Sequence, residues 1–94
     1  MLTHVVMFRF EDLTDVGPAV ALLRGLAGRI PAANSLRVGT NLRASTGAFD
    51  VMLVSEHDDA DALEAYRVHP EHRRVVAWLD EHPCDRVAFD SMDL

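Results

Sequence analysis

The first ten residues alternate between two faces in the manner of a β-strand. His4, Val6, Phe8 and Phe10 fall on one face, and Thr3, Val5, Met7 and Arg9 fall on the other. Successive side chains of a strand point to opposite sides of its sheet. The pattern therefore predicts a strand over residues 2–10 with apolar side chains on both sides.

The next segments alternate helix and strand patterns. Residues 11–17 are polar and typical of a turn, and Pro18 suits the first turn of a helix. A stripe at helical spacing predicts that this helix continues to Pro31; its members are Ala19, Leu22, Leu23, Leu26, Ala27 and Ile30. Strands are expected over 36–42, where Gly39 marks a bulge or bend, and over 49–56. A flexible loop is expected between them, over 43–48.

The second half of the chain predicts two helices that meet at a proline. Asp58 or Asp59 caps the first helix, which runs through Val68. Proline disfavours helical geometry at the residue before it and is favoured in a first turn, so the second helix begins at Pro70. It is expected to continue to about residue 82, and a last strand follows over 86–92.

The order β-α-β-β-α-α-β predicts an α+β, ferredoxin-like fold in a single domain over residues 1–94. Such a sheet carries helices on one face. Val5, Met7, Met52 and Val54 lie on the other face, which is too apolar to remain in water. A second copy packed sheet against sheet would bury it, so we expect a homodimer with a barrel-like core.

Composition narrows the classes of partner and the compartment. A chain of 94 residues that is 49% hydrophobic is not a disordered protein, and a net charge of -6 argues against nucleic acid and against anionic membrane surfaces. Met1 leads directly into the strand pattern, and no apolar run reaches the ~20 residues that cross a bilayer. The single Cys84 fits a reducing compartment. We expect a cytoplasmic protein.

Candidate chemistry gathers around the proline between the two helices. Tyr66 shares a helix face with Leu63, and His72 belongs to the stripe that continues through Val75 and Leu79. Both side chains should therefore point inward, where His4 faces them from the first strand. A neutral imidazole can accept a proton and a phenol can hold an oxyanion, so the three groups predict a site for proton transfer.

A metal site is not expected at this junction. His69 and His72 have the spacing of a ligand pair, but Pro70 breaks the regular helical face that would aim both rings at one ion. The paired cysteines and the His-Glu-x-x-His pattern of zinc sites are absent from the sequence. His69 itself is more simply a helix cap.

Several motifs together resemble the stress-responsive dimeric α/β-barrel (Dabb) family over essentially the whole chain. They are His4 in the opening His-Val-Val-Met-Phe, Gly39-Thr40-Asn41, Phe49-Asp50, the segment from Leu63 to His72 with its Tyr-x-x-His-Pro-x-His signature, and Asp90. The resemblance implies a ferredoxin-like protomer that forms a dimeric barrel.

The resemblance also implies an activity. The motif is similar to that of plant polyketide cyclases of the olivetolic acid type, which close a linear poly-β-keto thioester by an aldol step without a cofactor. By that similarity Tyr66 and His72 would be the catalytic pair and His4 a third catalytic group. The expected ligand-binding residues are Val6, Phe8, Val20, Leu23, Val51 and His69.

Two other interpretations stay open. Tyr66, His72 and His4 would equally serve to hydrogen-bond one another in a non-catalytic protein that binds a small apolar ligand or has a structural role in stress responses. A cofactor-free monooxygenase acting on a phenol or quinol is the third interpretation.

Overall fold

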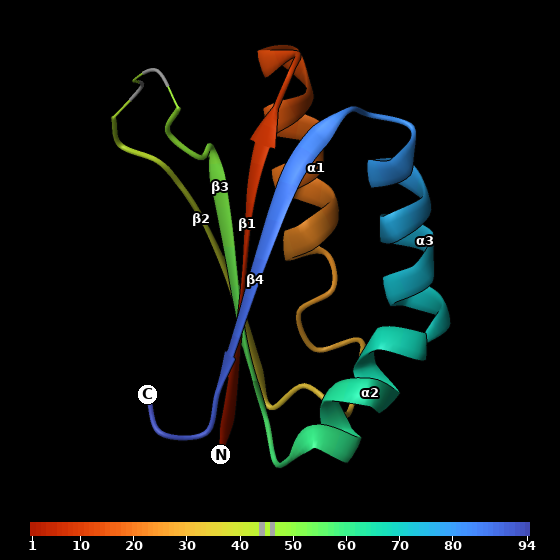
Figure 1. Ribbon diagram of the computed structural model, residues 1–94. Coiled ribbons are helices and arrows are strands. Elements are labelled where there is room, and N and C mark those ends of the chain that lie inside the picture. The colour runs from red at the N-terminus through yellow and green to blue at the C-terminus, as the bar shows by residue number, and fades with distance from the viewer. Residues whose placement is uncertain (44, 46) are drawn as a thin grey trace.

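The computed structural model describes residues 1–43, 45 and 47–94. Over these residues the chain forms one antiparallel sheet, with all of the helices on one side of it (Figure 1). The elements are β1 (Leu2–Phe10), the short 3-10 helix η1 (Leu13–Asp15), α1 (Val16–Arg24), β2 (Ser35–Thr40), β3 (Val51–His57), α2 (Ala60–Val68), α3 (Pro70–Asp80) and β4 (Cys84–Ser91). The strand order is β2-β3-β1-β4, which confirms the predicted ferredoxin-like fold.

The first helix is shorter than its apolar stripe predicts. α1 begins at Val16, so Pro18 lies in its first turn as predicted, but it ends at Arg24 and the predicted end at Pro31 is wrong. Glycine costs about 1 kcal/mol in a helix interior, and Gly25 and Gly28 follow the last helical turn. Gly28 adopts a φ of 76°, which a helix does not allow. The chain continues in tight turns that still bury Leu26 and Ile30.

The strand bounds also shift, because pairing with the neighbouring strand decides where each strand ends. β2 pairs with β3 in an unbroken register from Ser35 opposite Glu56 to Thr40 opposite Val51. The bulge expected at Gly39 is therefore wrong. β4 begins at Cys84, which pairs with Phe10, two residues before its predicted start. The loop expected over 43–48 includes positions 44 and 46, which lie outside the described residues.

The predicted break between the second and third helices is confirmed. The Asp59 side chain caps α2 by accepting a hydrogen bond from the Ala62 backbone N–H at 2.8 Å. His69 has extended backbone angles and caps α3, with its Nδ1 accepting from the Glu71 N–H at 3.1 Å. α3 ends at Asp80, two residues earlier than expected.

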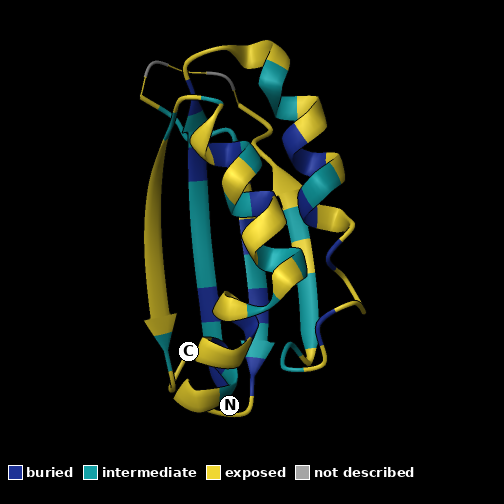
Figure 2. Cartoon of the chain, turned by 90° about the vertical axis from the view of Figure 1, so that its right-hand side faces the viewer, coloured by how far each residue is buried: buried dark blue, intermediate teal, exposed yellow. Residues whose placement is uncertain are grey.

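The two faces of the sheet differ in what covers them. The buried core lies between the sheet and the helices, and β4 remains exposed along most of its length because no described helix covers it (Figure 2). The opposite face carries an apolar patch in which Val5 pairs with Val54 and Phe89, and Met7 pairs with Met52 and Val87. Phe89 is 60% exposed and Val87 is 45% exposed. Within the described residues, no helix is both long and apolar enough to span a membrane.

Candidate active site

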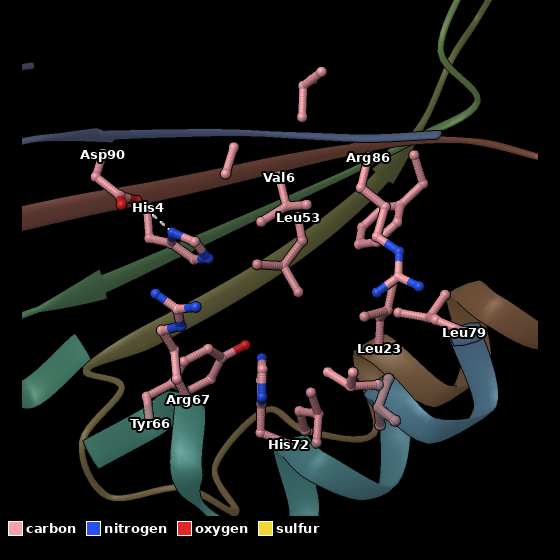
Figure 3. Close-up of a pocket in the computed structure, with 16 residues that line it drawn as sticks. His4, Val6, Leu23, Leu53, Tyr66, Arg67, His72, Leu79, Arg86 and Asp90 are labelled. Atoms are coloured by element: carbon pink, nitrogen blue, oxygen red, sulfur yellow. Dashed lines mark hydrogen bonds and ion pairs between the residues drawn. The ribbon is translucent and has the colours of Figure 1, made fainter. Parts of the chain in front are cut away.

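The junction of α2 and α3 places Tyr66 and His72 against each other. Tyr66 lies on the last turn of α2 and is only 1% exposed, while His72 lies on the first turn of α3. Their ring centroids are 4.6 Å apart, with an angle of 59° between the ring planes. Figure 3 shows the Tyr66 hydroxyl pointing toward the His72 ring at one end of a pocket. The structure confirms the inward orientation predicted for both side chains.

A further histidine, His57, which the sequence pattern did not single out, packs on the other side of Tyr66. The His57 ring centroid lies 4.9 Å from that of Tyr66, and the His57 side chain is fully buried. Its Nδ1 donates to the Ala32 carbonyl at 2.8 Å, so its Nε2 accepts from the Ser55 hydroxyl, also at 2.8 Å. Because both nitrogens of His57 are engaged, this ring holds Tyr66 in place rather than exchanging protons with a ligand.

His4 approaches Tyr66 from the sheet. Its ring centroid lies 6.3 Å from that of Tyr66, and its Nδ1 is hydrogen-bonded to the carboxylate of Asp90. The pairing of β1 with β4 sets His4 directly opposite Asp90. A carboxylate on one ring nitrogen fixes the orientation of the ring and directs the other nitrogen, Nε2, away from it. Asp90 therefore belongs to the site.

These groups line one pocket of about 270 Å³ between the sheet and the helices (Figure 3). Tyr66, His72 and His4 lie together in it. Among the residues expected to bind a ligand, Val6, Phe8 and Leu23 also line the pocket. Val20 and Val51 do not line it and are buried in the core, and His69 caps α3. Arg67, Arg86 and Asp90 are further lining residues that the pattern did not assign to a ligand.

In the part of the chain that the structure describes, no group of three or more histidine, cysteine or acidic side chains is arranged to hold a metal ion. The Nδ1 of His69 is occupied by the hydrogen bond that it accepts from the Glu71 N–H at the start of α3.

A family model described as the stress responsive A/B barrel domain (Dabb) matches residues 2–93. The chain belongs to this family. It is 33% identical to an uncharacterised protein of Streptomyces coelicolor over 86% of this chain and 89% of that protein. Crystal structures of two dimeric ferredoxin-like proteins of unknown function are similar to this Dabb chain. The protein from Thermobifida fusca is 29% identical, with a TM-score of 0.82 over 96% of this chain and 88% of that one. The protein from Bacteroides fragilis is 25% identical, with a TM-score of 0.83 over 96% and 93%.

The environment of the Dabb pocket shifts the protonation of its two facing groups in ways that suit proton transfer. Burial alone raises the pKa of Tyr66 to about 12, so the phenol keeps its proton and can donate it in a hydrogen bond. Burial lowers the pKa of His72 below its ordinary value of 6.5, with the charges of His4 and Arg67 acting in the same direction. At neutral pH the imidazole is therefore uncharged and can accept a proton.

One nitrogen of His72 is short of a partner. Nδ1 is buried and forms no well-aligned hydrogen bond with any described residue, although the backbone carbonyl of Arg67 partly opposes the fall in the pKa of this ring. The other nitrogen, Nε2, lies on the side of the ring that faces the Tyr66 hydroxyl in Figure 3. Nε2 is thus the atom at which His72 can meet a ligand in the pocket.

The free energy of unfolding of this Dabb protein is expected to decrease as the pH falls below about 6.5. The folded-state pKa of His72 is lower than 6.5, so between the two pKa values the unfolded chain binds a proton that the folded chain does not. The contribution of His72 to the free energy of unfolding is fully present above pH 6.5 and is lost as the pH falls through the folded-state pKa of this ring. Urea unfolding of the wild type and His72→Gln over this pH range tests this, because the variant should lose less stability. Parallel curves would contradict it.

Proposed function

We propose that this Dabb protein is a cofactor-independent cyclase that closes a small linear poly-β-keto substrate by an aldol step. The observation that carries the proposal is the meeting of Tyr66 and His72 in one apolar pocket, with the phenol protonated and the imidazole neutral at pH 7. An aldol closure needs a base for a proton between two carbonyls and a donor for the enolate oxygen that forms.

Each group has a role that its surroundings support. Nε2 of His72 would take a proton from the methylene carbon, and the Tyr66 hydroxyl would donate a hydrogen bond to the enolate oxygen. The methylene carbon then forms a bond with the carbon of a more distant ketone, and the alkoxide formed there receives the proton from His72. This carbon–carbon bond closes the ring, and loss of water from the aldol product would then form a carbon–carbon double bond within it. His4, held by Asp90, faces Tyr66 from the opposite wall and would orient a second carbonyl.

The size of the pocket also favours a small substrate over a polymer. Ligand pockets of proteins commonly enclose about 300–1,000 Å³, and this one measures about 270 Å³. Its walls are mostly apolar, with Val6, Leu23, Leu53 and Leu79 between the polar groups. Apolar walls exclude water, which strengthens each hydrogen bond to a developing charge.

We further propose that the protein acts as a homodimer, in the cytoplasm. The apolar patch of Val5, Met7, Met52, Val54, Val87 and Phe89 supports the dimer, as do the similar crystal structures described as dimeric. Packing two such sheets face to face would enclose both patches in a barrel-like core.

Ring closure by the wild-type protein tests the proposal. A linear tetraketide thioester is incubated with the protein, and the products are followed by liquid chromatography and mass spectrometry, together with oxygen uptake. The expected result is a cyclic product one water lighter than the substrate, formed faster than in buffer and without oxygen consumption. Unchanged substrate, or a rate equal to that in buffer, would contradict the cyclase.

A non-catalytic binding protein is the second candidate, because the bonds that fasten His57 to Ala32 and His4 to Asp90 would also suit a purely structural role. That function predicts that a ligand raises the melting temperature without being converted. Product formation separates the two candidates, and oxygen uptake would instead indicate a monooxygenase.

A further inference from the structure

The pocket holds two arginines whose charges are compensated differently. Arg86 lines the pocket near Leu79 and forms an ion pair with Asp80 at 2.7 Å. Asp90, the acidic residue that lines the pocket, is paired with His4. Arg67 lines the pocket as well, yet it takes part in no ion pair among the described residues. Arg67 is therefore the pocket arginine that no acidic side chain of the described residues pairs with.

Arg67 stands beside the proposed reaction site. It directly follows Tyr66 in α2, and Figure 3 shows its guanidinium turned toward the His4 side of the pocket, over the Tyr66 ring. Its charge reaches the pocket, since it contributes to lowering the pKa of His72. The side chain is exposed, so an anion that reached it from solvent would lose little hydration before the first contact.

The negative net charge of the molecule limits where an anion can bind. The chain carries 15 acidic and 9 basic side chains, so its general surface repels anions. A ligand that is anionic at one end and apolar along its length could meet the guanidinium of Arg67, and its apolar part would follow the wall of Leu23, Leu53 and Leu79. A guanidinium also offers a planar fork of donors that matches carboxylate and phosphate oxygens.

We propose that Arg67 is the anion-binding residue of the pocket and that the ligand is an amphipathic oxyanion whose apolar or keto-bearing part lies along Tyr66 and His72. This inference rests on the proposed function, because it names the chemical class of molecule that the same pocket takes. The oxyanion is the carboxylate of a free acid or the phosphate of a thioester carrier, and both would use the same guanidinium.

Two matched pairs of probes test the inference by titration calorimetry. The first pair is octanoate and octanamide, and the second is hexanoyl pantetheine with and without its terminal phosphate. The anionic member of at least one pair is expected to bind wild type about tenfold more tightly than its neutral partner. Arg67→Gln should remove this preference and leave the neutral affinity within about twofold. The pair that shows the preference identifies the source of the oxyanion.

Arg74→Gln is the matched control, since it removes one positive charge from the next helix at a side chain that pairs with Glu71 and does not line the pocket. It should keep the preference. Equal binding of both members of both pairs to wild type, or a preference that survives Arg67→Gln, would overturn the role of Arg67 and leave the cyclase proposal standing. A wild type that binds none of the four probes while it still cyclises the polyketide would overturn the anion site alone. Absence of both binding and turnover would overturn both.

Discussion

His72→Gln is expected to reduce the rate of ring closure by about 10²- to 10⁴-fold, which is the usual contribution of a general base. Glutamine keeps much of the volume of the side chain but cannot accept a proton near neutral pH. Because the wild-type imidazole is uncharged at pH 7, the substitution removes no charge from the pocket. The fold should persist, and the measurement is the initial rate of product formation at a saturating concentration of substrate.

His69→Gln is the matched control, because His69 lies three residues earlier and caps α3 outside the pocket. It should lower stability by about 1 kcal/mol and leave the rate within a few fold. Tyr66→Phe should slow closure by about 10²-fold or more, since it removes the oxyanion donor. The double variant should be little slower than His72→Gln, because groups that act as a unit are not additive. A His72→Gln enzyme as fast as wild type would contradict the assignment of the base.

Val5→Asp is expected to convert the protein from a dimer into a monomer. Val5 lies at the centre of the apolar patch, between Val54 and Phe89. A symmetric dimer contains the substitution in both protomers, so its interface would bury two new carboxylates. At a cost of about 2 kcal/mol or more for each, the dimer should weaken on the order of 10³-fold. Light scattering at micromolar concentration should give twice the chain mass of 10.4 kDa for wild type and 10.4 kDa for the variant.

Val68→Asp provides the comparison for the dimer experiment. Val68 is 46% exposed but ends α2 on the helical side of the sheet, away from the patch. This variant carries the same chemical change and should remain a dimer. A wild type that elutes and scatters as a monomer, or a Val5→Asp variant that stays dimeric, would contradict the proposed sheet-to-sheet association.

The fold was predictable where a local signal determined it. The junction of α2 and α3 follows from the geometry that Pro70 imposes on His69, which the sequence shows directly. The end of α1 was not predicted, because Leu26 and Ile30 continue the apolar stripe even though Gly25 has already ended the helix. A stripe reports burial, and turns can bury the same side chains as a helix does.

The site was predictable for the groups that local spacing orients. Tyr66, His72 and His4 were each placed by helix or strand periodicity, and the structure brings them to one pocket. His57 was missed because the third strand was predicted to end at residue 56. Continuing the alternation of Val51 and Leu53 by four residues would have placed His57 inward.

Contacts between distant strands and cavity shape were beyond the reach of the sequence pattern. The pairing of His4 with Asp90 depends on the register between β1 and β4, whose residues lie at opposite ends of the chain. Val20 and Val51 have the inward orientation of pocket residues, but packing closes the core around them. Which inward side chains line a cavity is decided by three-dimensional packing, which periodicity does not report.

Exchange of the methylene protons of a β-ketothioester with deuterated water, followed by NMR, tests the central claim most directly, because it isolates proton removal from ring closure. The proposed role of the Tyr66–His72 pair predicts that wild type accelerates exchange well above the rate in buffer and that His72→Gln returns it to that rate. Exchange that proceeds at the buffer rate with wild type, or equally fast with both proteins, would contradict it.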